Sequence, residues 1–386
     1  MKIEWDRADL EFRDEVRTWL RENAPSEPRP LNGHSMREFD LAWQRTQWDG
    51  GWAGISWPAQ FGGRGLSLVQ QLIWFEEYGQ LDLPVIDSTF VGLRHAGPTL
   101  IARATDEQKA AHLAPILRGD VVWCQGFSEP EAGSDLASLR TRGVVDGDEL
   151  VVTGQKVWTS FADIGDWQEL LVRTDLDGSK HKGLTWIICD MHSPGIEVRP
   201  IKTMDGGSDF SEVFYDEVRI PIGNIVGRLH DGWSVAMSTL AFERGTAFTV
   251  NQVKLSAIVE RLIDDAKRLP APGGGGRAID DDEFARDLAR VRADAAALRS
   301  MTYMGISRNL RSPMPGPEGS MLKIAFGDLE QRVFRLLADL HGDELLRHPG
   351  NTWVRDYLYS YAATIGGGTS EIQRNIVAEK VLGLPR

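Results

Sequence analysis

The segment Trp123–Ser138, WCQGFSEPEAGSDLAS, holds the residues of this chain best suited to bind a polar ligand. It leaves a predicted strand and enters a tight turn around Pro130 and Gly133. The hydroxyl groups of Ser128 and Ser134, together with backbone N–H groups near Gly133, can donate hydrogen bonds to ligand oxygen atoms. A single turn of this composition is more often structural than functional, so the segment alone leaves both interpretations open.

A second segment, Val152–Ala162 (VTGQKVWTSFA), places an indole beside two hydroxyl groups. A predicted strand presents Trp158, and Thr159 and Ser160 follow directly. The indole can stack on a flat heterocycle, and the hydroxyl groups can form hydrogen bonds with the edge of that ring. The alternative is a core tryptophan at the end of a strand, which is favoured for any single tryptophan because the chain has 13 of them.

Both segments lie in the second of three predicted domains. Residues 1–120 form a helical domain, with helices predicted at Leu68–Tyr78 and Ala104–Leu117 and with Thr105 and Asp106 as capping candidates. Residues 121–232 contain short β-rich runs between Gly/Asp turns, with no helix between the runs. This pattern favours an antiparallel barrel or sandwich.

Residues 233–386 are helical again and predict a bundle. Its helices are expected at Ser234–Leu269, Asp281–Asn309, Ser320–Leu346 and Thr369–Leu382. The chain shows no βαβ alternation, and no GxGxxG sequence follows a strand. A dinucleotide-binding Rossmann fold is therefore excluded.

Charge and composition exclude several classes of function. The chain of 386 residues has 43 Lys+Arg and 56 Asp+Glu, a formal net charge of −13, which disfavours binding to nucleic acids or anionic membranes. Its two cysteines, Cys124 and Cys189, are too few for a disulfide scaffold, and the eight histidines show no metal-ligand spacing. The absence of a recognisable signal or membrane segment predicts a cytoplasmic protein.

Taken together, three collinear motifs resemble those of the acyl-CoA dehydrogenase family. They are SEPEAGSD at Ser128–Asp135, GQKVWTS at Gly154–Ser160 and GGTSEIQRNIVAEKVLGLPR at Gly367–Arg386. The resemblance covers essentially the whole chain. It implies an α+β fold with an N-terminal helical domain, a middle antiparallel β-barrel-like domain and a C-terminal four-helix bundle. It also implies a homodimer or tetramer, with a heteromeric assembly as a further possibility.

The resemblance further implies FAD, held at a junction of domains and subunits. Trp158 would stack on the flavin ring, and Ser160 would face its N5 side. Gly133 and Ser134 would meet the pyrophosphate, and Ser134 would also border the bound thioester. The full set of residues assigned to the cofactor is Gln125, Phe127, Ser128, Gly133, Ser134, Trp158, Thr159, Ser160, Thr369 and Glu371.

The implied reaction converts an acyl-CoA thioester to the trans-2-enoyl-CoA, and it needs a base for the Cα proton. Many family members carry this base as a Glu directly before the Gly-Thr of the C-terminal motif, where this chain has Gly367. Isovaleryl-CoA and long-chain members carry it in a Leu-x-x-Glu-Arg context, which Leu240–Gly245 (LAFERG) matches. Glu243 is therefore the candidate base, with an ion pair to a neighbour as its structural alternative. Arg244 is a candidate for shaping the substrate pocket, and the backbone N–H of Gly367 for binding the thioester carbonyl.

The chain departs from the family at a second place. The Arg-x-x-Phe-Gly that often contacts the neighbouring subunit's FAD is missing from Arg268–Asp282, and Arg277 is a weak substitute. Three hypotheses follow. The first is an acyl-CoA dehydrogenase that passes electrons to an electron-transfer flavoprotein, the second is a base-deficient subunit of a heteromeric enzyme, and the third is a flavin oxidase or monooxygenase. The segments GGRGLSLVQQLIW (Gly62–Trp74) and GTSEIQRNIVAEKVLGLPR (Gly368–Arg386) look like those of bacterial, especially actinobacterial, members, some of which act on bulky steroid side-chain or branched thioesters.

Overall fold

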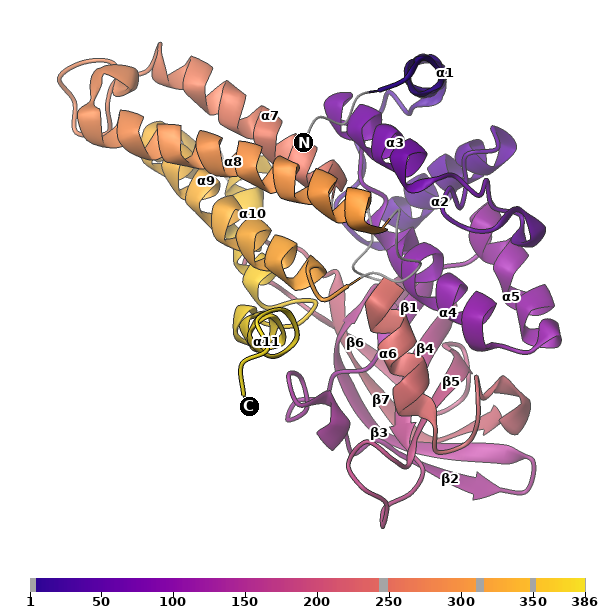
Figure 1. Ribbon diagram of the computed structural model, residues 1–386. Coiled ribbons are helices and arrows are strands. Elements are labelled where there is room, and N and C mark those ends of the chain that lie inside the picture. Colours follow the sequence, from indigo (N-terminus) through magenta and orange to yellow (C-terminus); the bar gives the residue numbers. More distant parts are fainter. Residues whose placement is uncertain (1–4, 243–248, 310–315, 348–351, 386) are drawn as a thin grey trace.

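A computed structural model describes residues 5–242, 249–309, 316–347 and 352–385. Figure 1 shows the N-terminal helices packed beside a curved sheet, with the C-terminal helices forming a long bundle that extends away from the sheet. This order of helices, sheet and helices is the architecture predicted from the sequence. The three parts meet around the near end of the bundle.

The N-terminal part consists of five α-helices, with the π-helical turn Val91–Ala96 leading into the fourth. They are α1 (Arg7–Asn23), α2 (Gly33–Asp49), α3 (Leu68–Gln80), α4 (Gly97–Arg103) and α5 (Asp106–Arg118). The predicted cap of α5 is confirmed: Thr105 Oγ1 accepts a hydrogen bond of 3.3 Å from the backbone N–H of Gln108. The side chain of Gln108 bonds back to the backbone N–H of Thr105, which completes a capping box.

The middle part is a seven-stranded sheet with the order β1-β4-β2-β3-β7-β6, in which β5 also pairs with β4. The strands are β1 (Trp123–Gly126), β2 (Arg142–Asp146), β3 (Glu149–Ser160), β4 (Trp167–Arg173), β5 (Leu184–Asp190), β6 (Ile196–Ile201) and β7 (Phe210–Pro221). The pairing is antiparallel, as expected, except that β4 runs parallel to β1 and to the start of β2. The spacing of the strands along the chain gave no sign of these two parallel pairings. The β2–β3 hairpin lies between β1 and β4 in the sequence, so β1 and β4 become neighbours only in the folded sheet.

The C-terminal part contains α6 (Gly232–Phe242), α7 (Thr249–Ala266), α8 (Asp282–Asn309), α9 (Gly319–Arg347), α10 (Thr352–Tyr359) and α11 (Ser370–Ile376). The described parts of the predicted helix Ser234–Leu269 form two helices, α6 and α7. Leu262, Val291, Leu298, Leu329 and Val333 form the centre of the core that joins α7, α8 and α9. The sequence gave no separate prediction for α10, which packs on α9 and has only eight residues.

The largest core cluster joins the N-terminal helices to the sheet and to α6. Trp57 and Leu100 contribute from the N-terminal part, Trp123 and Trp186 from β1 and β5, and Val235 from α6. All five side chains are at most 2% exposed. Helix α6 therefore lies against the sheet and α4, apart from the bundle that begins at α7.

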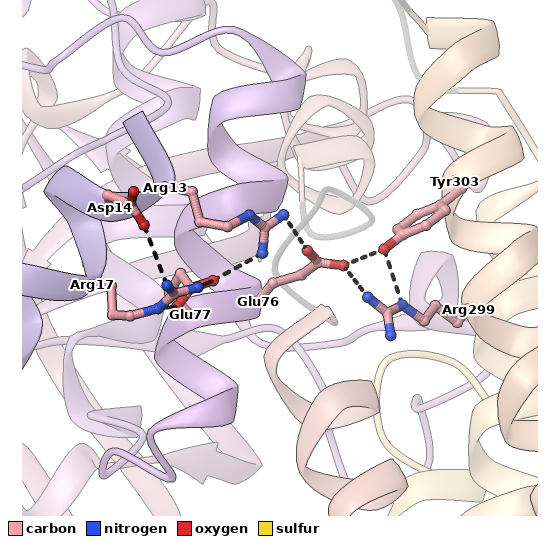
Figure 2. Close-up of polar contacts among 7 residues, drawn as sticks. All are labelled: Arg13, Asp14, Arg17, Glu76, Glu77, Arg299 and Tyr303. Carbon is pink, nitrogen blue, oxygen red and sulfur yellow. Dashed lines mark hydrogen bonds and ion pairs between the residues drawn. The ribbon is translucent and has the colours of Figure 1, made fainter. Parts of the chain in front are cut away.

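Two adjacent carboxylates of α3 connect α1, α3 and the bundle (Figure 2). Arg13 of α1 donates hydrogen bonds of 2.8 Å to both Glu76 and Glu77. From α8, Arg299 donates a hydrogen bond of 2.9 Å to Glu76, and the hydroxyl group of Tyr303 donates another. Glu76 and Glu77 are 1% exposed, so their charges are stabilised by these partners and not by water.

We predict that Glu76→Gln lowers the free energy of unfolding by about 3–5 kcal/mol, because it leaves two arginines facing an uncharged buried group. Urea unfolding followed by circular dichroism measures the change. The matched control is Glu11→Gln, whose carboxylate is 65% exposed and pairs only with Arg7; its expected loss is below about 1 kcal/mol. Equal losses in the two variants would contradict the structural role of Glu76.

Candidate active site

A buried ion pair joins the two motifs that the sequence singles out. Lys156 of β3 is fully buried, and its Nζ donates hydrogen bonds of 2.8 Å to Glu129 Oε1 and 3.0 Å to the carbonyl of Phe127. One residue further along β3, the backbone N–H of Val157 donates to the carbonyl of Ser128 at 2.9 Å. The turn after β1 is thereby fixed against the end of β3.

Glu129 also holds the far side of the turn. Its two carboxylate oxygens accept hydrogen bonds from the backbone N–H groups of Arg140 and Thr141, at 2.6 and 2.8 Å. Burial acts to raise the pKa of Glu129, but the Lys156 ammonium and these donors outweigh it and hold the pKa below its usual range. Burial lowers the pKa of Lys156 to about 8, against the opposing effect of Glu129. Both groups are therefore charged at neutral pH.

Trp158 stands out from the sheet in an unusual backbone conformation. A register shift between β3 and β7 falls between Lys156 and Thr159, and Trp158 there has a φ of +59°. Its side chain is 57% exposed and contacts Phe210 edge-on, with ring centroids 6.0 Å apart. A left-handed backbone is rare for a bulky residue and is typical of functional sites. The exposed fraction excludes the alternative of a core tryptophan.

The two hydroxyl residues after Trp158 lie in different surroundings. Ser160 is half-buried at the end of β3. Thr159 is fully buried opposite Ser211 of β7, and within the described ranges neither its Oγ1 nor that of Ser211 has a hydrogen-bond partner. Trp158 and Ser160 are thus accessible to a ligand, whereas Thr159 faces the neighbouring strand.

The turn that follows β1 presents an open glycine. Gly133 and Ser134 are exposed, and no atom lies within 4 Å of the position that a Cβ at Gly133 would occupy. Asp135, also exposed, accepts hydrogen bonds from Ser138 and Lys180, and the Lys180 bond is the main reason that its pKa is lowered. The backbone near Gly133 can therefore be approached closely by a ligand.

Gln125 of β1 and Phe127, the residue that follows β1, differ in burial. Gln125 Nε2 donates a hydrogen bond of 2.7 Å to Glu169 Oε1 and lies 3.1 Å from His95 Nδ1. Phe127 is 4% exposed and belongs to the core that joins the sheet to the N-terminal helices. Phe127 is therefore a core side chain, whereas Gln125, like Ser128, is half-buried.

The C-terminal motif begins in a left-handed loop. Gly367 and Gly368 have φ values of +62° and +88°, and Gln373 Nε2 donates to the carbonyl of Gly367 at 2.9 Å. Thr369 caps α11 by accepting a hydrogen bond of 3.3 Å from the N–H of Ile372. Glu371 is exposed in the first turn of α11. A side chain at Gly367 would be strained by this backbone, which is consistent with glycine at that position.

Arg355 of α10 connects the bundle to the sheet beside Ser160. Its guanidinium pairs with Asp205 at 3.2 Å and with Asp209 at 3.5 Å, both in the loop between β6 and β7. The carbonyl of Asp209 accepts a hydrogen bond of 2.7 Å from the N–H of Phe161, the residue after Ser160. Sequence reasoning missed these ion pairs, because Asp205-Gly206-Gly207 is recognisable only as a turn.

Glu243 and Arg244 lie outside the described residues, so the structure gives no position for the candidate base and its neighbour. Arg277, a weak candidate for contact with the cofactor, forms a local ion pair of 2.7 Å with Asp280. In the described ranges, no three His, Cys, Asp or Glu side chains group together as metal ligands. Among the same residues, no helix has the length and apolar character needed to span a membrane.

The exposed indole of Trp158 and the open turn at Gly133 fit a cofactor that combines a flat ring system with phosphate groups. The ring system has an accessible aromatic face to stack on. The phosphate oxygens have the exposed N–H groups of Gly133 and Ser134 to bind. The residues present therefore fit a flavin nucleotide.

We predict that the contribution of Lys156 to stability increases between about pH 8 and pH 10.5. Its pKa is about 8 in the folded chain and 10.5 ordinarily, so the unfolded chain binds more protons in this range and stability rises with pH. Urea unfolding of the wild type and of Lys156→Met at several pH values gives the difference, and the Glu129→Gln/Lys156→Met double variant serves as the uncharged reference. A difference that is independent of pH would show that the lysine does not titrate in this range.

Comparison with known proteins gives a consistent result over the whole chain. Three acyl-CoA dehydrogenase family models match it in order: the N-terminal domain at residues 7–120, the middle domain at residues 124–218 and the C-terminal domain at residues 230–382. Acyl-CoA dehydrogenase IpdE1 of Mycobacterium tuberculosis is 37% identical over 386 residues, which cover 97% of this chain and 98% of the relative.

Solved structures agree with this result. A chain of the ChsE4-ChsE5 complex from Mycobacterium tuberculosis is 33% identical with a TM-score of 0.85, and the match covers 100% of both chains. A chain of the Tcur3481-Tcur3483 steroid acyl-CoA dehydrogenase is 29% identical, also with a TM-score of 0.85 and 100% of both chains covered. The first of these structures is a complex, and both are named after two proteins. The chain belongs to the acyl-CoA dehydrogenase family of oxidoreductases.

Proposed function

We propose that this protein catalyses the FAD-dependent α,β-dehydrogenation of an acyl-CoA thioester to the trans-2-enoyl-CoA. The observation that carries the proposal is the exposed, left-handed Trp158, held beside the open turn at Gly133 by the buried Lys156–Glu129 pair. A surface of this kind suits a flat ring system with phosphates attached, and the family to which the chain belongs uses such a cofactor.

FAD would be held by the indole of Trp158, the hydroxyl groups of Ser128 and Ser160, and the backbone of Gly133 and Ser134. Bound there, FAD supplies the acceptor for the hydride that leaves the substrate Cβ. Thr369 and Glu371 are proposed to contact the cofactor from the start of α11. The protein contributes orientation, exclusion of water and control of the Cα proton.

Glu243 is proposed as the base that accepts the Cα proton. It directly follows α6, which packs against β5 of the sheet. The left-handed backbone of Gly367 supports this choice, because a side chain would be strained here at the position that carries the base in many relatives. The Gly367 N–H is proposed to donate a hydrogen bond to the thioester carbonyl, which stabilises the developing enolate. Arg244 is proposed to shape the pocket.

The substrate is proposed to be a bulky thioester derived from a steroid, since one similar structure is that of a steroid acyl-CoA dehydrogenase. The electron acceptor is proposed to be an electron-transfer flavoprotein. The principal test is an anaerobic titration of the purified yellow protein with a panel of linear, branched and steroid side-chain acyl-CoAs. Bleaching of the flavin absorbance by members of one class is expected, and failure of every thioester to bleach it would refute the reaction.

A second candidate function is that of a subunit that needs a different partner chain to complete its site. One similar structure is the ChsE4-ChsE5 complex, and the other also carries the names of two proteins. The chain also exposes large apolar side chains, namely Trp158 of β3, Met204 in the loop between β6 and β7, and Ile365, Leu382 and Leu384 near the C-terminus. Purification of this chain alone without stoichiometric flavin, and recovery of flavin on addition of the partner, would favour this assembly over a homodimer or tetramer.

We predict that Glu243→Gln lowers kcat by at least ~10²-fold, because the amide cannot accept the Cα proton. Flavin content and the Kd for acyl-CoA are expected to stay close to those of the wild type. The matched control is Glu260→Gln in α7, a 56% exposed carboxylate paired with Arg292, for which normal turnover is expected. Normal turnover of Glu243→Gln would remove this residue from the mechanism and leave the dehydrogenation itself untouched.

A further inference from the structure

The glycine loop at residues 366–368 has no side chains to fix its own conformation, so its shape depends on contacts from elsewhere. The carbonyls of its two left-handed residues are both bonded. Gln373 Nε2 donates to the carbonyl of Gly367 at 2.9 Å. Lys323 Nζ, from α9, donates to the carbonyl of Gly368 at 2.5 Å. Gln373 lies close to the loop in sequence, whereas Lys323 lies 45 residues before Gly368. Lys323 therefore ties the loop to the bundle.

The N–H groups of the loop are used differently from its carbonyls. The N–H of Gly366 donates to the carbonyl of Ala362 at 2.9 Å. Within the described part of the chain, the N–H groups of Gly367 and Gly368 have no acceptor, and Gly367 is exposed. In a trans peptide the C=O and the N–H point in opposite directions. Because the Gly367 carbonyl is directed at Gln373, the N–H of Gly368 points away from Gln373. The loop thus bonds its carbonyls to the protein and leaves two N–H donors for a ligand.

Lys323 belongs to a stripe of α9 that also holds the residues just before the loop. Lys323, Gly327 and Gln331 are four residues apart, so they lie on one face of the helix. Gln331 Nε2 donates to Thr364 Oγ1 at 3.1 Å. A Cβ at Gly327 would lie 3.0 Å from the carbonyl oxygen of Ala363, so the absence of a side chain lets α9 pack closely there. The stripe therefore supports the chain up to the loop and places its charged member, Lys323, at the loop itself.

We propose that Lys323 is a positioning residue for the reaction: by holding the Gly368 carbonyl, it keeps the N–H of Gly367 directed at the thioester carbonyl. The proposal rests on the proposed function, in which that N–H binds the substrate. An ammonium group suits the role, because a hydrogen bond from a charged donor is about twice as strong as one between neutral groups. Such a bond can hold a glycine loop whose own backbone is free to move.

A positioning role and a purely structural role of Lys323 predict different results. If Lys323 only stabilises the fold, its removal weakens the binding of every ligand of the site alike. If it positions the N–H donor, its removal weakens only those ligands that carry the carbonyl oxygen. It also lowers kcat more than it raises KM, because the hydrogen bond to that oxygen strengthens as negative charge develops in the transition state.

The test compares two unreactive ligands on the oxidised holoenzyme in excess FAD, with its partner chain if one is required. They are trans-3-cyclohexylprop-2-enoyl-CoA and S-(trans-3-cyclohexylprop-2-enyl)-CoA, a thioether that lacks only the carbonyl oxygen. Calorimetry on the wild type is expected to give a Kd at least about 10-fold lower for the enoyl compound. Lys323→Met is expected to lower this preference about 10-fold. Lys323→Arg, which can still donate to the Gly368 carbonyl, is expected to retain most of it.

Turnover of the acyl-CoA that bleaches the wild-type flavin most strongly gives a second readout. In Lys323→Met, kcat is expected to fall about 10- to 10²-fold, with KM within about 3-fold of the wild type. If that variant does not fold, Lys323→Gln, whose amide donates without a charge, is expected to show a smaller loss in the same direction.

The matched control is Arg332→Met, which removes another cation of α9, 46% exposed and paired with Asp294 at 2.8 Å. Its preference and its kcat are expected to equal those of the wild type. An unchanged preference in Lys323→Met, or an equal loss of affinity for both compounds, would overturn the positioning role while the wild type still bleaches with acyl-CoA. Failure of every acyl-CoA to bleach the wild type would instead refute the reaction.

Discussion

The buried pair of Lys156 and Glu129 is the interaction on which the candidate site depends. Its lysine comes from β3 and its carboxylate from the turn after β1, so one ion pair fixes two segments that are far apart in sequence. Burial of an ion pair costs desolvation free energy, and this pair is tolerable because Glu129 also accepts two backbone N–H bonds while Lys156 also bonds a carbonyl. An arrangement so fully hydrogen-bonded permits little displacement of either segment.

The rigidity of this pair explains how Trp158 keeps a conformation that the backbone disfavours. A left-handed residue with an exposed indole would relax if its neighbours could move. Lys156 lies two residues before it, fully buried, and Thr159 follows it, paired in register with Ser211. The strain is therefore confined to one residue, and its indole is held outward where a ring can stack on it. The hydrogen bonds of Glu129 therefore help to hold the indole on which the cofactor is proposed to stack, although none of these bonds is made to Trp158 itself.

Local patterns in the sequence predicted the order of the three parts, the cap at Thr105 and the motifs that meet at the site. These features depend on residues that are close in sequence or on motifs that are recognisable in themselves. The parallel pairing of β4 and the ion pairs of Arg355 with Asp205 and Asp209 were not predictable. Each depends on contacts between residues that are far apart in the sequence, and such contacts leave no periodic signal. The indole of Trp158 was predicted as a candidate, but its exposure became clear only from the bulge in β3.

The glycine loop at residues 366–368 and the proposed role of Glu243 as the base are best understood together. With left-handed φ values at Gly367 and Gly368, the loop can present its backbone closely to a ligand, but it cannot carry a carboxylate there without strain. A base must then come from another element, and a position after α6 has the advantage that α6 rests on the sheet and not on the bundle. The hydrogen bond from Gln373 fixes the loop from its far side. The N–H donor and the proposed base would thus belong to separately supported elements, so that a change in one leaves the other in place.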